Sequence, residues 1–262
     1  MVAQFINSLL AVEQYSFSLD ELMRQTQKSK NAVRLEISNL IEKNEVLNLR
    51  HGFYLILPPK YRSLGKLPLN LYVNKLFSTL ERKYYIGFYS AAKIYGASHQ
   101  QSQVDYILSQ PPKLLDVKKS PIALRFLTTK DWPKGNVITK KSDAGLYNIS
   151  SPILTLADLV RYQNKLGGIN RMLATIEELM EEVTKEDVVT FLKWYDHKAT
   201  LQRLGFLMHY IDEENEFSTL ILNKLQAAKI YPILLQPVTK KRPGAVDNPF
   251  KVAINITLDN DI

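Results

Sequence analysis

Cysteine is absent from all 262 residues of the chain, and its absence excludes several structures at once. No disulfide can form, no thiolate can bind a metal ion, and no cysteine nucleophile is available. A chain of this length buries a core without such cross-links, and a cysteine-free sequence is typical of a reducing compartment. The length predicts two domains.

Long hydrophobic runs are also missing. No window approaches the roughly 18 apolar residues that a membrane-spanning helix requires. The first ten residues lack the basic start of a signal peptide, and Asn7 and Ser8 interrupt their apolar stretch. We therefore expect a cytoplasmic protein with no membrane partner.

The motifs of common enzymes are missing as well. There is no P-loop, no dinucleotide-binding glycine pattern and no serine elbow, and the four histidines lack metal-ligand spacing. One pattern, Asp105 followed by Asp116 and Lys118, resembles the acids and lysine of a Mg²⁺-dependent nuclease. Asp116 follows two prolines in an apparent loop, which disfavours a rigid metal site. The sequence therefore predicts no catalytic residue, no metal site and no cofactor.

Positive charge is present in excess but is unevenly distributed. The net charge is +8, with +2 in residues 1–62, +8 in residues 63–150 and −2 in residues 151–262. A basic middle segment favours a surface that faces a polyanion. The residues of this possible basic surface are Lys113, Lys118, Lys119, Arg125, Lys130, Lys134, Lys140 and Lys141.

Three short helices are predicted at the N-terminus. Apolar residues at helical spacing between Phe5 and Leu10 form the buried stripe of the first helix. Ser18 and Glu21 form a capping box that starts the second helix. Ser29 caps a third helix to about Asn44, with Val33, Ile37, Leu40 and Ile41 as its core stripe. A short helix, a polar turn and a third helix indicate a helix-turn-helix.

The exposed face at the start of the third helix is suited to DNA. Arginine pairs with guanine and asparagine with adenine in the major groove, whereas lysine and serine contact phosphates. The predicted DNA-binding residues of this region are Lys28, Ser29, Lys30, Asn31, Arg34 and Ser38.

A β-hairpin is predicted directly after the third helix. Residues 47–49 and 53–57 alternate as strands, and a loop of Arg50, His51 and a left-handed Gly52 joins them. This register pairs Leu49 with Phe53 and Leu47 with Leu55. Arg50 and His51 then lie at the tip of a wing, where they meet phosphate or the minor groove.

The whole chain is predicted to be α+β, a winged helix-turn-helix followed by a larger mixed α/β domain. We place the DNA-binding domain at residues 1–62, a connector at 63–83 and the second domain at 84–262. In the second domain, strands are expected at 104–108, 122–127, 136–139, 147–149 and 250–258. Helices are expected at 88–95, 152–163, 168–182, 185–196, 200–211 and 217–227.

Several segments resemble the AbiEi family of antitoxins, which belong to type IV toxin–antitoxin systems of abortive infection. They are residues 84–96 (YYIGFYSAAKIYG), 150–162 (SSPILTLADLVRY), 167–170 and 201–206. The resemblance covers most of the chain. It implies an antitoxin that neutralises a nucleotidyltransferase toxin, often without a stable complex, and that represses its own operon by binding inverted repeats in promoter DNA.

Two alternatives remain beside this interpretation. One is a plain winged-helix transcriptional regulator whose larger domain senses a ligand or a protein. The other, less favoured, is the Mg²⁺-dependent nuclease suggested by Asp105. The resemblance transfers no catalytic residues, and the DNA contacts rest on the residue pattern alone.

Overall fold

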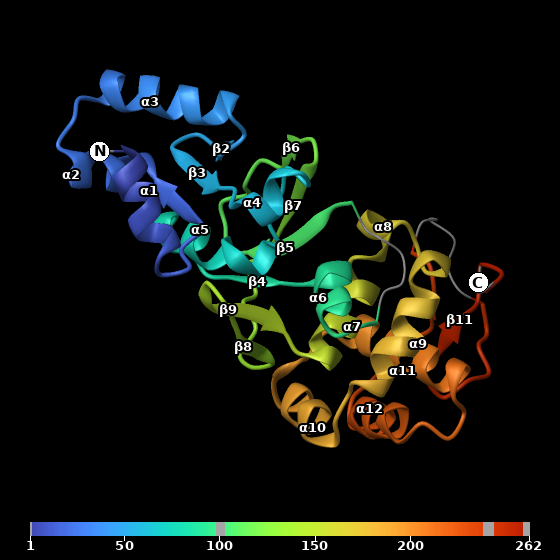
Figure 1. The fold of residues 1–262 in the computed structure, drawn as a ribbon. Coiled ribbons are helices and arrows are strands. Elements are labelled where there is room, and N and C mark those ends of the chain that lie inside the picture. The colour runs from blue at the N-terminus through green and yellow to red at the C-terminus, as the bar shows by residue number, and fades with distance from the viewer. Residues whose placement is uncertain (1, 98–102, 238–243, 259–262) are drawn as a thin grey trace. The chain divides into compact units, whose positions relative to one another are not determined.

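The computed structural model describes residues 2–97, 103–237 and 244–258 (Figure 1). These residues form two compact units, each built from separate stretches of chain. Unit 1 comprises residues 1–85, 103–130 and 139–149, and unit 2 comprises residues 86–102, 131–138 and 150–262. The domain boundaries predicted from the sequence stay a prediction.

Unit 1 begins with an N-terminal module, residues 2–56, that contains three helices and three strands. Its elements are α1 (Val2–Leu10), β1 (Ser16–Ser18), α2 (Leu19–Thr26), α3 (Lys30–Glu42), β2 (Val46–Arg50) and β3 (Phe53–Ile56). The strands form an antiparallel sheet in the order β1-β3-β2. The three predicted helices and the hairpin are confirmed, whereas β1 was not predicted.

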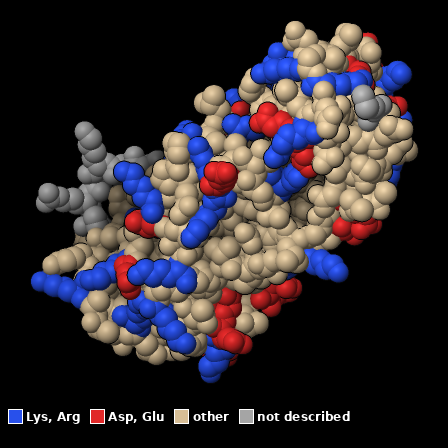
Figure 2. Space-filling view, turned by 90° about the vertical axis from the view of Figure 1, so that its left-hand side faces the viewer, with Lys and Arg blue, Asp and Glu red and all other residues tan. Residues whose placement is uncertain are grey.

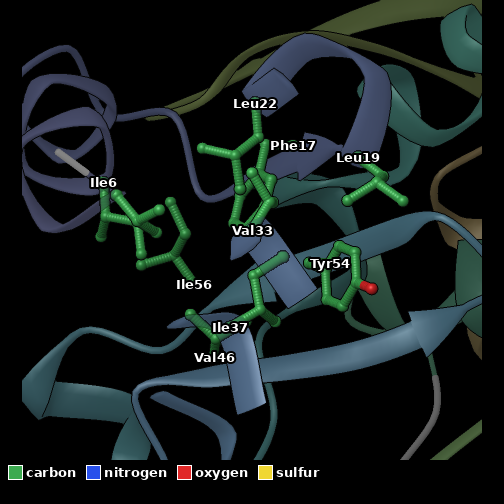
Figure 3. Close-up of a cluster of buried hydrophobic side chains, with 10 residues drawn as sticks. Ile6, Phe17, Leu19, Leu22, Val33, Ile37, Val46, Tyr54 and Ile56 are labelled. Atoms are coloured by element: carbon green, nitrogen blue, oxygen red, sulfur yellow. The ribbon is translucent and has the colours of Figure 1, made fainter. Parts of the chain in front are cut away.

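The module has its own hydrophobic core, which fixes how α3 is turned. Figure 3 shows Val33 and Ile37 of α3 directed toward Phe17 of β1 and Leu22 of α2. All four side chains are almost completely buried. Phe17 also stacks on Tyr54 of β3, with ring centroids 5.4 Å apart. Because this contact fixes one side of α3, its opposite side is left for solvent or a ligand.

The hairpin differs in part from the predicted register. Leu47 pairs with Leu55 as expected, but Phe53 pairs with Arg50 instead of Leu49, because the register shifts between Asn48 and Arg50. Leu49 is therefore an extra residue in β2 that forms a β-bulge. The bulge lets the side-chain alternation of the two strands match although the turn between them is short. Gly52 has φ of +73°, which confirms the predicted left-handed position.

The segment after the hairpin packs into unit 1. It contains α4 (Pro59–Arg62), a 3₁₀ turn (Leu69–Leu71) and α5 (Val73–Thr79). Tyr72, Val73 and Phe77 are buried, and the Phe77 ring stacks on Tyr84 with centroids 4.5 Å apart. Most of the residues predicted as a connector thus belong to a packed region.

A six-stranded sheet lies mostly within unit 1. Its strands are β4 (Tyr84–Ile86), β5 (Asp105–Ser109), β6 (Val117–Lys119), β7 (Ile122–Thr128), β8 (Val137–Ser142) and β9 (Gly145–Ser150), in the order β6-β7-β5-β4-β9-β8. β5 and β7 are parallel, whereas β6 and β7 are antiparallel. The sequence predicted β5, β7, β8 and β9 but missed the two short strands β4 and β6.

Unit 2 is mainly helical. Its helices are α6 (Phe88–Ile94), α7 (Pro152–Arg161), α8 (Gln163–Leu166), α9 (Leu173–Glu181), α10 (Lys185–Trp194), α11 (Lys198–Ile211) and α12 (Glu216–Gln226), with a 3₁₀ turn at Asn170–Met172. α7 is buried at every position from Ile153 to Val160. It contacts α6, α9, α10 and α11, and is therefore the centre of the helical core.

The end of the chain is less regular than predicted. In place of a strand over 250–258, unit 2 has a two-stranded parallel sheet of β10 (Ile233–Leu234) and β11 (Val252–Ala253). The predicted helix over 168–182 is confirmed only from Leu173 onward, after a 3₁₀ turn. The predicted α+β class, with a larger α/β part after the N-terminal helices and strands, is confirmed. Over the described residues, no helix has the length and apolarity to cross a bilayer.

Candidate nucleic-acid interface

Caps define both ends of α2 and the start of α3, and they thereby fix the turn between the two helices. The Ser18 hydroxyl accepts the Glu21 N–H at 3.1 Å, while Glu21 accepts the Ser18 N–H, so the predicted capping box is present. α2 ends where Gln27 adopts a left-handed conformation, with φ of +53°. Ser29 then starts α3, and its hydroxyl accepts the Ala32 N–H at 3.4 Å. The two helices are thus joined by a tight, ordered turn.

The structure brings most of the predicted DNA-binding residues of α3 together on its solvent side. Lys30, Asn31, Arg34 and Ser38 are exposed, and none of them has a side-chain hydrogen bond or ion pair among the described residues. They lie at spacings of three or four residues, so their side chains are neighbours on one face of the helix. The guanidinium of Arg34 is therefore free to contact a base edge.

Lys28 differs from its neighbours because its charge is already paired. Its ammonium donates to the carboxylate of Glu36, one helical turn beyond Ala32. This hydrogen bond from Lys28 is the main cause that lowers the pKa of Glu36 below its ordinary value. A phosphate that contacts Lys28 must compete with Glu36.

One exposed residue of α3 was missed by the sequence analysis. The side chain of Leu35 is 68% exposed and lies between Asn31 and Ser38 along the helix. Its position was readable from the sequence, because the buried residues Val33 and Ile37 leave position 35 on the opposite side. An apolar side chain on such a face is suited to a thymine methyl group.

The two predicted residues of the hairpin occupy different positions. His51 is exposed in the turn, whereas Arg50 is the last residue of β2 and is half-buried. One guanidinium nitrogen of Arg50, Nη1, is buried and has no hydrogen-bond partner among the described residues. The turn therefore presents His51, while Arg50 ends β2 directly before the turn and pairs with Phe53.

The eight residues of the predicted basic surface belong to both units, because Lys134 lies in unit 2 and the other seven lie in unit 1. All except Lys140 are exposed, but consecutive residues of a strand, such as Lys118 and Lys119, point to opposite sides of the sheet. Arg125 lies 4.0 Å from Asp116. Figure 2 shows Lys and Arg side chains interspersed with Asp and Glu on one side of the molecule. Lys113, Lys118, Lys119, Lys130, Lys134 and Lys141 stay a predicted surface.

The carboxylates proposed for a nuclease already have structural contacts. Asp116 accepts the N–H of Phe126 at 3.0 Å, and this hydrogen bond ties the loop that precedes β6 to strand β7. Over the described residues, no group of three or more His, Asp or Glu side chains is placed to hold a metal ion. The nuclease interpretation receives no support from this geometry.

A buried polar network starts the central helix of unit 2. Asp187 accepts the N–H of Ile153 at 3.0 Å and a hydrogen bond from the Asn136 amide at 2.7 Å. The Asn136 carbonyl oxygen accepts the Trp194 indole N–H at 2.7 Å. Ser151, the predicted N-cap, makes no side-chain capping hydrogen bond. Asp187 thus caps α7 from another helix, which gives these polar groups a structural role.

Comparison with known proteins gives one family match and one similar solved structure. Residues 85–210 match the family model described as the AbiEi antitoxin C-terminal domain. No curated protein matches the sequence. The crystal structure of the RV2827C protein from Mycobacterium tuberculosis is similar, with a TM-score of 0.64 and 12% sequence identity, over 95% of this chain and 89% of that chain. At this identity the likeness shows the fold alone.

Proposed function

The chain belongs to the AbiEi antitoxin family through its residues 85–210, and on that premise we propose how it acts. It neutralises a nucleotidyltransferase toxin and represses its own operon by binding inverted repeats in the promoter. It acts without catalysis and without a cofactor. The N-terminal module, a winged helix-turn-helix in this proposal, supplies the sequence specificity.

The observation that carries the DNA-binding half is the unpaired polar face of α3. Helix α3 follows α2 through a capped turn, is fixed by Val33 and Ile37, and is followed by a hairpin. This order of elements is that of a helix-turn-helix with a wing. Lys30, Asn31, Arg34 and Ser38 have no side-chain partner within the described residues, so this part of α3 is ready to contact an external one.

The side chains of α3 divide into two groups by chemistry. Arg34 carries the paired donors that recognise guanine, Asn31 carries the donor and the acceptor that recognise adenine, and Leu35 adds an apolar contact for thymine. Ser29, Lys30, Lys28 and Ser38 contact phosphates and position the helix in the major groove. His51 contacts the backbone or the minor groove beside the hairpin.

The toxin-neutralising half rests on the family alone. The matched domain is an antitoxin domain, and in this proposal residues 84–262 counteract the toxin. The described residues of unit 2 present no metal-binding group, and their central helix is buried on all sides. The proposal therefore assigns the surface of unit 2, and no interior site, to antitoxin activity.

Two experiments test the two halves separately. Gel retardation with the chain's own promoter fragment and a shuffled fragment of equal length is expected to give a specific complex at low salt. Failure to retard the promoter fragment would refute DNA binding. Co-expression with the neighbouring nucleotidyltransferase is expected to restore bacterial growth, and continued growth arrest with a stably expressed antitoxin would refute neutralisation.

A further inference from the structure

Basic residues of unit 1 lie near the turn end of β2, a strand that contacts the edge strand β6 (Figure 1). Arg50 ends β2, Lys119 ends β6, and Arg82 lies two residues before β4. All three belong to the same compact unit. The sequence analysis did not select Arg82 as a DNA-binding residue.

Lys119 is anchored directly on the hairpin. Its ammonium donates to the backbone oxygen of Asn48 at 2.6 Å and contacts the Asn48 side-chain oxygen at 3.3 Å. Asn48 lies two residues before Arg50 in the same strand. Because both acceptors are neutral, they orient the ammonium without balancing its charge.

Arg50 and Arg82 carry charges that oppose each other. Burial lowers the pKa of Arg50 below its ordinary value, and the nearby charge of Arg82 lowers it further. Arg82 donates one hydrogen bond, at 2.6 Å, to the neutral backbone oxygen of Pro112. The buried Nη1 of Arg50 has no partner in the part of the chain that the structure describes. The charge of Arg82 thus acts on Arg50, and no ion pair offsets either guanidinium group among the described residues.

No carboxylate balances this group of cations. Within the described residues, none of Arg50, Arg82 and Lys119 lies in an ion pair. Proteins rarely keep partly buried like charges together without a counter-ion, because each one raises the free energy of the other. The arrangement is therefore incomplete without an external anion.

We propose that Arg50, Arg82 and Lys119 form a binding site for a phosphate group, which the backbone of the bound DNA supplies. Two planar guanidinium forks and one ammonium match the charge and the several acceptor oxygens of a phosphate. The site rests on the proposed DNA-binding function and extends it. The hairpin then contacts DNA through Arg50 at the end of β2 as well as through His51, and β6 takes part in binding.

The test compares equilibrium DNA binding of Arg82→Gln and Lys119→Gln with that of the wild type. The matched control is Lys193→Gln, which removes an exposed lysine of α10 that has no ion pair among the described residues. Fluorescence anisotropy is recorded with the promoter duplex and with a shuffled duplex, across a range of salt concentrations. Thermal melting verifies that each variant is folded.

Loss of one phosphate contact flattens the slope of log affinity against log salt by about 0.9. At roughly 0.1 M salt this corresponds to an affinity about eightfold lower, on both duplexes alike. The Lys193 variant is expected to bind as the wild type does. Arg82→Lys, which keeps the charge but loses the fork, is expected to lie between Arg82→Gln and the wild type.

Unchanged affinity and salt slope in the folded Arg82 and Lys119 variants would overturn the proposal. If the wild type does not bind its promoter, the proposed function fails, and a titration with inorganic phosphate at constant ionic strength tests the site by itself. Resonances of the arginine Nε–H groups are expected to shift in the wild type and not in Arg82→Gln. If phosphate shifts these resonances but the variants bind DNA as the wild type does, the site binds phosphate and the proposal that DNA supplies this phosphate is refuted.

Discussion

Replacing Gly205 with alanine is expected to destabilise unit 2, although the same change normally stabilises a helix. Gly205 lies inside α11, and a Cβ at this position would be 2.4 Å from Cε1 and 2.8 Å from Cδ1 of Phe250. It would also lie 3.0 Å from Cγ2 of Ile221. Phe250 and Ile221 are both buried, so neither side chain has solvent to move into.

The magnitude follows from two opposing effects. Alanine is favoured over glycine in a helix interior by about 1 kcal/mol. Inserting a methyl group into a packed core costs about 1–3 kcal/mol, and occasionally more. Phe250 is also held by its backbone, since the Gln202 amide donates to its carbonyl oxygen at 2.8 Å. Because a ring-to-Cβ distance of 2.4 Å requires a real displacement, we expect the upper end of this cost, about 3 kcal/mol, and after the helix gain a net loss of about 2 kcal/mol.

The assay is thermal unfolding followed by circular dichroism. The expected loss lowers the melting temperature by roughly 4–8 °C for a chain of this size. Gly244→Ala is the control, because no heavy atom of the described residues lies within 4 Å of its added Cβ, and its effect is expected to stay within about 0.5 kcal/mol. The double variant Gly205→Ala with Phe250→Leu should lose less stability than the sum of the losses of the two single variants. A melting temperature raised by Gly205→Ala would refute the close contact.

Three further predictions concern the N-terminal module and the caps. Leu35→Ala should abolish any preference for thymine over uracil at one promoter position, measured by anisotropy with uracil-substituted duplexes; equal loss on both duplexes would exclude the methyl contact. Glu36→Gln should release Lys28 and raise DNA affinity with a steeper salt slope, whereas Glu42→Gln serves as the control; an unchanged slope would contradict the competition. His197 caps α11, since its Nδ1 accepts the Thr200 N–H at 3.2 Å, and burial, followed by Arg161 and Arg203, lowers its pKa below 6.5. As the pH falls through 6.5, the unfolded state takes up a proton before the folded state does, so stability falls. His197→Asn keeps a cap without the titration and should reduce the drop in melting temperature between neutral and mildly acidic pH; an identical drop would contradict this role.

Local features of the fold were predictable from the sequence. The capping box at Ser18 and Glu21 joins residues three positions apart, and the helical stripe of Val33 and Ile37 repeats within one helix. The left-handed conformation of Gly52 depends only on the residue type at that one position. Such signals are contained within a short stretch of chain, which is why they can be read without a structure.

Other features depend on contacts between distant residues. The three-residue strand β1 forms because it pairs with β3, about forty residues later, and its sequence carries too short an alternation to show this. Ile41 was predicted as core but is 37% exposed, whereas Leu40, one position earlier, packs against the core as predicted. Asp187 caps α7 across 34 positions of sequence, so the pattern favoured Ser151 instead.

The candidate site shows the same division. The helical periodicity of α3 predicted that Arg34 and Asn31 are exposed. The same periodicity also places Leu35 on the exposed side, although it was not selected. The approach of Arg82 and Lys119 to the hairpin was not predictable, because it depends on how β6 packs against β2. The site residues stay predictions until DNA binding is measured.

Arg34→Ala tests the central claim, that α3 reads base sequence, most directly. Affinity for the promoter duplex and for a shuffled duplex is measured by fluorescence anisotropy at one salt concentration. The account predicts a loss of about 1–3 kcal/mol on the promoter duplex and a much smaller loss on the shuffled duplex, so that sequence preference relaxes. An equal loss on both duplexes would contradict base recognition by α3 and reduce Arg34 to a phosphate contact.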